Sequence, residues 1–162
     1  MEEDSDMNKY EKFRKEHSDS PFWGIELLRD SLLPDLLDQD IHDILYWAGK
    51  DLATKFPVAS NDDLQAFFKQ SQFGNLELKK ENIKKISWKL SGPKVETRLK
   101  LNKDPDFMLE AGFLAQTKQQ IDQISTECEA TIKLNSVNFT VVSDPNAPVN
   151  NPSDFKTINI AK

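Results

Sequence analysis

The sequence predicts an α+β fold in which N-terminal helices, and one helix from the C-terminal half, pack on an antiparallel sheet of about five strands. Three observations support this prediction. Apolar residues recur with a helical period of about 3.6 residues between positions 41 and 56. After position 75, apolar and polar residues alternate repeatedly, as they do in strands. The order is helices, strands, a helix and strands, and short turns between neighbouring strands are typical of antiparallel sheets.

The chain begins with a segment that is rich in charge. Residues 1–19 carry seven acidic and four basic side chains and few apolar ones, which indicates a flexible acidic lead-in. Ordered structure is expected to begin at Ser20-Pro21, a serine cap followed by a proline at the first helical position. This first helix is predicted to end near Ser31. Because of Pro34, residues 33–39 are compatible with one bent helix or with two.

The clearest helical pattern follows Asp40, which is a candidate cap. Pro57 ends this helix. Ser60 and Asp63 form an approximate capping box before a shorter helix, which is predicted to end near Gly74. The apolar stripe of the longer helix is predicted to consist of Ile41, Ile44, Leu45, Ala48, Leu52 and Phe56.

The strands are predicted from alternation. They cover residues 76–79, 83–90 and 95–101, with a turn at Gly92-Pro93, and then 128–134 and 137–141, joined at Asn135-Ser136. The folded domain is therefore expected to span residues 20–143. The proline- and asparagine-rich residues 144–162 are expected to form a disordered tail.

Residues 107–124 form a predicted helix with a small, close-packing patch. Asp104 and Asp106 precede it, where a carboxylate can cap unpaired N–H groups. Ala111, Gly112 and Ala115 leave little side chain on adjacent turns. An exposed glycine within a helix costs about 1 kcal/mol relative to alanine, so Gly112 predicts close approach of the backbone to a sheet or another helix.

Composition excludes several classes of function. The net charge of −6 disfavours nonspecific binding to nucleic acid or to anionic membranes, since both need a dense basic face. No apolar run approaches the ~18 residues that a membrane span needs. The acidic start does not resemble a secretory signal. The single cysteine excludes an intrachain disulfide and favours a reducing compartment, so a cytoplasmic location is expected.

The potential catalytic and metal-binding residues argue against an enzyme. Structural zinc usually needs four Cys or His ligands, whereas this chain has only Cys128, His17 and His42. Cys128 alternates into an apolar strand face and is expected in the core, while His42 lies off the apolar stripe and is expected to be exposed. The chain has no nucleophile elbow, P-loop or dinucleotide fingerprint. We therefore expect no metal, no cofactor and no enzymatic activity.

Three groups of residues each allow a structural or a functional interpretation. Glu110 is either partly exposed near a helix start or a buried carboxylate with a raised pKa, which would mark a site. The aromatic residues form either an ordinary core or an apolar pocket between helices and sheet. The candidate pocket residues are Trp47, Phe56, Phe67, Phe68, Trp88, Glu110, Phe113 and Phe139. A lysine group is either a solvated strand face or a patch for an anionic head group or acidic partner; it comprises Lys79, Lys80, Lys84, Lys85 and Lys89.

Two long motifs resemble the YslB family, small proteins of Firmicutes. They are YWAGKDLATKFP at residues 46–57 and LEAGFLAQ at residues 109–116. Residues 32–37, LLPDLL, also fit, as does Gly92-Pro93 followed by Arg98-Leu99-Lys100. The resemblance covers residues 22–142.

The YslB family is in turn similar to a superfamily with vinyl-reductase-type sensor domains, Bet-three-type subunits of the TRAPP vesicle-tethering complex and haem-nitric-oxide-binding domains. This similarity implies helices packed on an antiparallel sheet, with an apolar ligand between them or association through the helices. Vinyl-reductase-type domains often carry a cysteine pair near the final hairpin, where this chain has only Cys128.

Two functions are therefore expected. The first is a non-enzymatic binding module for a small apolar ligand such as an acyl chain, acting as a sensor or carrier. The second is a homodimeric protein–protein adaptor with a filled core and an exposed apolar helix surface. A closed apolar cavity near Trp47 and Phe113 favours the first function, and a dimer without such a cavity favours the second.

Overall fold

The computed structural model describes residues 8, 10–11, 15 and 22–161. The chain divides into two compact units, Met1–Asp38 and Gln39–Lys162. Of the predicted lead-in, residues 1–19, only residues 8, 10, 11 and 15 are described. The predicted helix start at Ser20-Pro21 lies outside the described residues.

The N-terminal unit is helical from residue 23 to residue 37. It runs through α2 (Trp23–Leu27), the π-helical turn η1 (Leu28–Leu32) and α3 (Leu33–Leu37), and the short η2 (Asp38–Asp40) follows. Pro34 has no N–H group to donate to the helical ladder, and the wider η1 turn directly precedes α3, in which Pro34 lies. Of the two alternatives for residues 33–39, the single bent helix fits this path.

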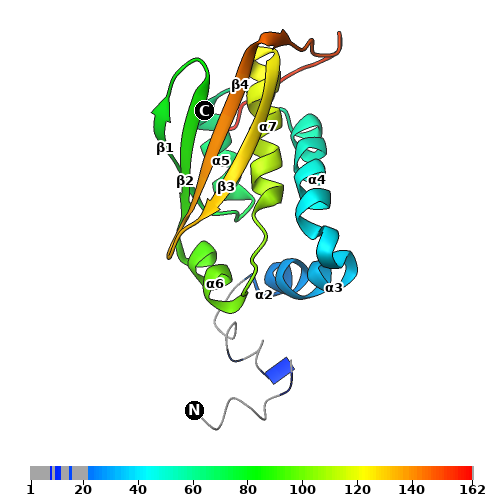
Figure 1. Ribbon diagram of the computed structural model, residues 1–162, viewed down its shortest axis with the longest axis vertical. Coiled ribbons are helices and arrows are strands. Elements are labelled where there is room, and N and C mark those ends of the chain that lie inside the picture. Colours follow the sequence, from blue (N-terminus) through cyan, green and yellow to red (C-terminus); the bar gives the residue numbers. More distant parts are fainter. Residues whose placement is uncertain (1–7, 9, 12–14, 16–21, 162) are drawn as a thin grey trace. The chain divides into compact units, whose positions relative to one another are not determined.

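The second unit is an α+β structure. Its helices are α4 (Ile41–Lys55), α5 (Asn61–Gln70), α6 (Pro93–Leu101) and α7 (Met108–Asp122), and its strands are β1 (Asn75–Glu81), β2 (Lys85–Ser91), β3 (Ile124–Ile132) and β4 (Val137–Pro148). The strands form one antiparallel sheet in the order β1-β2-β4-β3 (Figure 1). The predicted fold class is confirmed. The sheet has four strands in the described chain, fewer than the five expected. No helix of the described residues is both long and apolar enough to cross a membrane.

The missing strand is a helix. Residues 95–101 were predicted as a strand because Val95, Thr97, Leu99 and Leu101 alternate with polar residues, but they form α6. Gly92 precedes the helix with a φ of 114°, and Pro93 occupies its first turn, where a proline loses no helical hydrogen bond. Val95 and Arg98, three residues apart, are the buried positions of α6. The buried residues of α6 therefore follow the helical period, and the alternation of apolar and polar residues in this segment does not reflect a strand.

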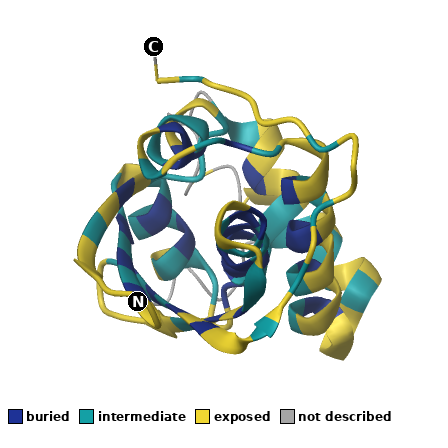
Figure 2. Cartoon of the chain, turned by 90° about the horizontal axis from the view of Figure 1, so that it is seen from above, coloured by how far each residue is buried: buried dark blue, intermediate teal, exposed yellow. Residues whose placement is uncertain are grey.

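Helix α7 forms the centre of the second unit (Figure 2). It packs against α4 and against the strands β3 and β4. All residues from Glu110 to Ala115 are buried, so that more than a full turn of α7 has no solvent-exposed side. Such complete burial is typical of a helix that is enclosed by other elements.

The packing of α4 on α7 depends on two glycines. A Cβ atom on Gly112 would overlap the carbonyl oxygen of Tyr46 in α4, and a Cβ atom on Gly49 would overlap the carbonyl oxygen of Leu109 in α7. Each glycine thus lies against the backbone of the other helix. The predicted close approach at Gly112 is confirmed, and its partner is a helix.

This close contact also corrects the predicted buried face of α4. Ile41, Leu45, Gly49 and Ala53 are buried at intervals of four residues, whereas Ile44, Ala48 and Phe56 are exposed. The prediction, which followed the large apolar residues, therefore assigned the buried side of α4 partly to residues that are exposed. The buried face includes the small residues Gly49 and Ala53 because Gly49 lies against the backbone of α7, and Ile44, Ala48 and Phe56 of the predicted stripe remain outside.

The C-terminal residues follow a defined path in the structure, which differs from the expected disordered tail. Strand β4 continues to Pro148, and the backbone N–H of Val149 donates to the carbonyl oxygen of Gln123 over 2.9 Å. Farther on, residue 158 forms a parallel bridge with residue 58. The carboxylate of Asp63 accepts hydrogen bonds from the N–H groups of Ile160 and Ala161, at 2.6 and 2.8 Å. These long-range bonds have no signal in local composition.

His42 joins the start of α4 to the segment before α7. Its Nδ1 lies 2.6 Å from Oδ2 of Asp106, and its Nε2 lies 3.0 Å from Oδ2 of Asp104. The hydrogen bond with Asp106, and then that with Asp104, raises the pKa of His42 above its ordinary value of 6.5. Asp106 also accepts from the N–H of Met108 at the start of α7, as predicted for a carboxylate at this position. His42, expected to be exposed, is thus partly buried in an ionic contact.

The glycine contact predicts a selective loss of stability. Gly112→Ala should lower the free energy of unfolding by about 2–3 kcal/mol, because the new methyl group meets backbone atoms that can move only with α4. Gly24→Ala in α2 is the matched control, since its Cβ has open space and alanine favours a helix by about 1 kcal/mol. Urea denaturation measures both changes. Equal effects of the two variants would contradict the role of the contact.

The His42 contact predicts that stability depends on pH. Because folding raises the pKa of His42, its contribution should be complete below about pH 6.5 and should disappear as the pH rises through the folded pKa. Wild-type protein should therefore lose stability relative to His42→Gln across this interval in urea denaturation. An NMR titration that gave a folded pKa at or below the ordinary value would disprove this coupling.

Candidate functional site

Three of the predicted pocket residues meet between the helices and the sheet. The ring of Phe67 in α5 stacks on that of Phe113 in α7, with centroids 4.6 Å apart and planes 10° apart. Phe68 packs edge-on against Phe113 at 5.9 Å. Trp88 and Phe139 reach the same core cluster from the sheet. The rings of Phe67 and Phe68 both contact that of Phe113, so no ligand lies between these three side chains.

The other two aromatic candidates come from α4 and lie outside this cluster or at its margin. Phe56 is partly exposed and contacts Phe67 with centroids 5.9 Å apart. Trp47 is 67% exposed and lies on the outer surface of α4 with Ile44 and Ala48. Trp47 therefore lies on the surface, whereas Phe113 is buried in the core cluster.

Glu110 is buried, with no exposed side chain, in the first turn of α7. Its Oε1 lies 3.8 Å from Nη1 of Arg98, which is itself buried in α6. The Arg98 guanidinium also donates to the carbonyl oxygen of Asp106 over 2.6 Å and lies 4.4 Å from the centre of the Phe107 ring. Buried charges need such partners, and this arrangement joins α6 to α7. Sequence reasoning had placed Arg98 in a strand and thus missed the partner.

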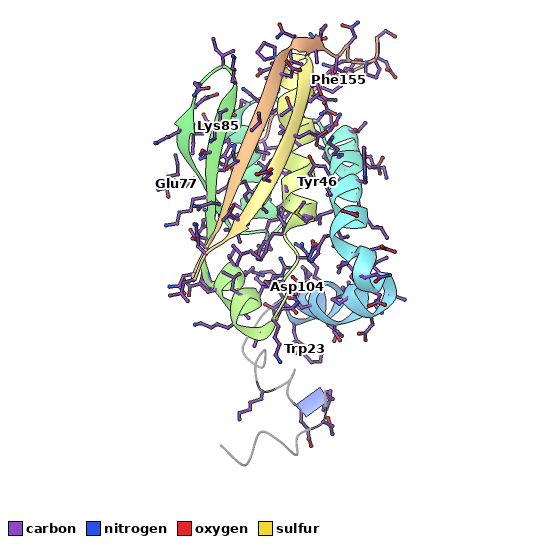
Figure 3. All side chains as sticks on the ribbon, in the orientation of Figure 1. Trp23, Tyr46, Glu77, Lys85, Asp104 and Phe155 are labelled. Carbon is purple, nitrogen blue, oxygen red and sulfur yellow. The ribbon has the colours of Figure 1, made fainter. Side chains whose placement is uncertain are left out.

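A polar cluster between α4 and β3 was not predicted. Lys50, almost fully buried in α4, donates from Nζ to Oε1 of Glu127 over 2.9 Å. The Tyr46 hydroxyl donates to Glu127 and accepts a 3.1 Å hydrogen bond from the Cys128 backbone N–H. Figure 3 shows Tyr46 between α4 and the sheet. The only sequence signal was the four-residue spacing of Tyr46 and Lys50, which places both on one face of the helix.

The same cluster holds Trp47 in place. The Nζ atom of Lys50 lies 5.1 Å from the centre of the Trp47 ring and 5.3 Å from that of Tyr46. A lysine ammonium at this distance from a tryptophan ring is attracted by about 0.5–1 kcal/mol at an exposed site. The Lys50 ammonium, paired with Glu127, therefore favours this orientation of the exposed Trp47 ring.

Two groups of this cluster, the Tyr46 hydroxyl and the Cys128 thiol, have raised pKa values. Burial, followed by the hydrogen bond to Glu127, raises the pKa of Tyr46. Burial, followed by the charges of Glu127 and Glu129, raises the pKa of the Cys128 thiol. Cys128 is buried as expected, and a thiol with a raised pKa is a poor nucleophile at neutral pH. Among the described residues, no three His, Cys, Asp or Glu side chains are grouped so as to hold a metal ion.

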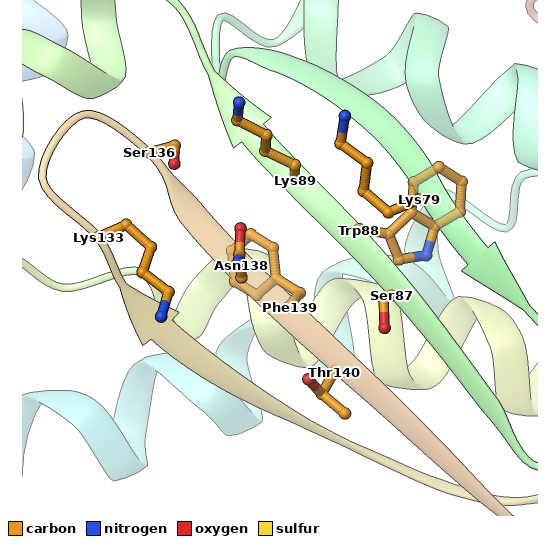
Figure 4. Close-up of a pocket in the computed structure, with 9 residues that line it drawn as sticks. All are labelled: Lys79, Ser87, Trp88, Lys89, Lys133, Ser136, Asn138, Phe139 and Thr140. Atoms are coloured by element: carbon orange, nitrogen blue, oxygen red, sulfur yellow. The ribbon is translucent and has the colours of Figure 1, made fainter.

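A groove of about 330 Å³ lies on the sheet, beside the β3–β4 hairpin (Figure 4). Polar side chains of β2 and β4 form its floor, and lysines from three strands or their ends surround them. Lys79 pairs with Glu77 over 2.6 Å, and this contact lowers the pKa of Glu77. The lining residues are Lys79, Ser87, Trp88, Lys89, Lys133, Ser136, Asn138, Phe139 and Thr140.

A second pocket of about 460 Å³ lies at the other end of the strands. Lys118 in this pocket forms ion pairs with Asp122 at 2.9 Å and with Glu81 at 3.7 Å. Two carboxylates and one lysine line it, so its net charge is negative. The groove beside the hairpin, in contrast, is lined by three lysines and no carboxylate.

Comparisons with known proteins agree with the sequence motifs. Residues 22–142 match the family described as protein of unknown function (DUF2507). The protein called "Uncharacterized protein YslB" of Bacillus subtilis (strain 168) is 40% identical over 129 residues, which cover 78% of this chain and 87% of that protein. The resemblance to the YslB family is confirmed.

A solved structure shows a similar fold at low sequence identity. A vinyl-4-reductase family protein from Methanocaldococcus jannaschii has a TM-score of 0.51 and 22% identity, covering 83% of this chain and 91% of its own. An Fe(II) unliganded H-NOX protein from K. algicida has a TM-score of 0.48 and 12% identity, covering 90% of this chain and 92% of its own. The first likeness concerns the fold alone. On the family match and the identity with the Bacillus subtilis protein, the chain belongs to the DUF2507 family.

Proposed function

We propose that this protein is a non-enzymatic interaction module in which two copies pair through the outer face of α4. The observation that carries this proposal is Trp47, which is 67% exposed and yet held in place by Lys50. Tryptophan is enriched among the residues that dominate binding energy at protein interfaces. Because its ring is already oriented, little conformational freedom is lost when a partner covers it.

The packed aromatic cluster favours this function over an internal ligand. An acyl-chain carrier needs a cavity between helices and sheet, but Phe67 and Phe113 are in direct ring contact there. Among the described residues, Ile44, Trp47 and Ala48 form an exposed apolar surface on α4. Of the two functions expected from the sequence, the homodimeric adaptor is the one supported by this geometry.

The outer face of α4 is suited to a second copy of itself. Trp47 and Ala48 lie at the middle of the helix, so a twofold axis at this point brings both tryptophans into the interface. Asp43 lies in the first turn and Lys55 in the last. In an antiparallel pair, the acidic end of each helix faces the basic end of the other, and the two helix dipoles also oppose one another favourably.

The chemistry of the buried groups supports a non-enzymatic role. Tyr46 and Cys128 have raised pKa values and remain protonated at neutral pH. The Lys50 ammonium is paired with Glu127. None of these three side chains is therefore an activated base or nucleophile. The single buried cysteine is also in keeping with a reducing compartment, and we propose the cytoplasm.

A substitution at the centre of the face tests the pairing. Wild-type protein should be dimeric at micromolar concentration in sedimentation equilibrium. Trp47→Glu should weaken the dimer by about 2 kcal/mol or more, roughly thirtyfold, because it removes the anchor and places two like charges at the axis. Ile83→Glu is the control, since Ile83 is 80% exposed in the β1–β2 turn, away from α4. A monomeric wild type, or equal weakening by both variants, would refute the proposal.

Native mass spectrometry separates the two expected functions. With the core filled by its own aromatic rings, the protein should show twice the chain mass under gentle conditions, with no additional small molecule. The same sample under denaturing conditions should give the chain mass alone. An adduct of lipid mass that survives gentle conditions and dissociates on denaturation would instead favour the apolar-ligand carrier.

A further inference from the structure

We propose that the groove beside the β3–β4 hairpin binds an anion that carries a phosphate group. The groove is built from the sheet, whereas the proposed pairing face is on α4, so this inference goes beyond the proposed function and does not depend on it. Three features carry it: the excess positive charge of the groove, its hydrogen-bonding floor and the rigid strands beneath it.

The charges in the groove favour a phosphate dianion. Three lysines line it, Lys79, Lys89 and Lys133, and no carboxylate does. Glu77 pairs with Lys79, and Glu129 lies opposite Thr140 at one end, so the five groups together keep a net positive charge, which attracts a phosphate monoester of about −1.5 to −2 at neutral pH. Figure 4 shows Lys79 and Lys89 on one side of Asn138 and Lys133 on the other, so that an anion over Asn138 lies between cations.

The floor supplies polar groups at the register positions where the strands pair. Lys89 lies opposite Asn138, and Ser87 lies opposite Thr140, in the antiparallel pairing of β2 with β4. Ser136 borders the floor from the hairpin turn, which is closed by a 2.8 Å hydrogen bond from the Lys133 N–H to the Ser136 carbonyl. Three hydroxyls and one amide can therefore donate hydrogen bonds to phosphate oxygens, while the lysines provide the charge.

The strands under the groove are fixed from their other face. Trp88 and Phe139 alternate with the floor residues and are buried in the core. Their burial holds β2 and β4 in register, so the polar groups need little reorganisation when an anion binds. Glu129, exposed on β3 opposite Thr140, places a negative charge at the end away from the hairpin. The groove volume of about 330 Å³ suits a phosphate with a small attached group.

Titration with inorganic pyrophosphate tests the site. In NMR spectra, the Asn138 side-chain amide and the backbone amides of Ser87 and Thr140 should shift in a saturable manner. Lys89→Gln and Lys133→Gln should each weaken binding by at least about tenfold, because each removes a charge-assisted contact. Lys156→Gln changes the net charge equally at an exposed position outside the groove and should leave the affinity unchanged.

Several outcomes overturn the proposal. The first is the absence of saturable shifts with pyrophosphate. The second is equal weakening of pyrophosphate binding by the groove variants and by Lys156→Gln. The third is binding of citrate as tightly as pyrophosphate, which would show that phosphate is not the recognised group. Circular dichroism of each variant checks that the fold is retained. The oligomeric state, measured in the same samples, shows whether α4 pairing succeeds or fails separately.

A vesicle experiment distinguishes the two sources of phosphate. Sedimentation of the protein with phosphatidylglycerol vesicles, lost on Lys89→Gln and absent with phosphatidylcholine vesicles, identifies a lipid head group as the ligand. Binding of pyrophosphate without binding to either vesicle identifies a free phosphate compound. Both results support a phosphate site. Vesicle binding that survives Lys89→Gln and Lys133→Gln together would place any membrane contact outside the groove and count against the head-group source.

Discussion

The direct contact between the backbones of α4 and α7 is the constraint on which the second unit depends. Gly49 and Gly112 each lie against a carbonyl group of the opposite helix, where any side chain would collide. A glycine inside a helix costs about 1 kcal/mol relative to alanine, so this contact has an intrinsic cost that close packing must offset. It also brings Tyr46 and Lys50 within reach of Glu127 on β3. The helix layer is thereby joined to the sheet edge by a polar cluster as well as by the core.

Local patterns predicted the features that depend on neighbouring residues. The alternation around Trp88 and Phe139 located the strands, and Gly112 indicated a close contact. The predictions were wrong where one segment fits two local patterns, or where a contact with a residue far away in the sequence determines which side of a helix is buried. Residues 95–101 satisfy both a strand and a helix period, and the preceding Gly92-Pro93 is a helix start as well as a turn. On α4, a count of large apolar residues could not detect that Gly49 and Ala53 continue the buried face from Ile41 and Leu45.

The candidate site was harder to predict because it is assembled from distant segments. Glu110 is buried, which was one of its two expected environments, but its partner Arg98 lies on a helix that was expected to be a strand. Lys50 meets Glu127 across 77 positions, which no spacing rule connects. Only Lys79 and Lys89 of the predicted lysine patch line the groove, and Lys133 joins them because β4 lies between β2 and β3 in the sheet. Strand order therefore determines which lysines act together.

The two faces of the sheet have different roles: the inner face packs in the core, and the outer face carries the proposed anion groove. In β2 and β4, side chains alternate, so burying Trp88 and Phe139 on the inner face requires Ser87, Lys89, Asn138 and Thr140 to lie on the outer face. On the inner face, Trp88 and Phe139 join the core cluster in which Phe67 stacks on Phe113. At the same time, they hold the outer polar groups in fixed positions. A filled core and a preorganised outer groove are thus two consequences of one strand register, and a register shift by a single residue would destroy both.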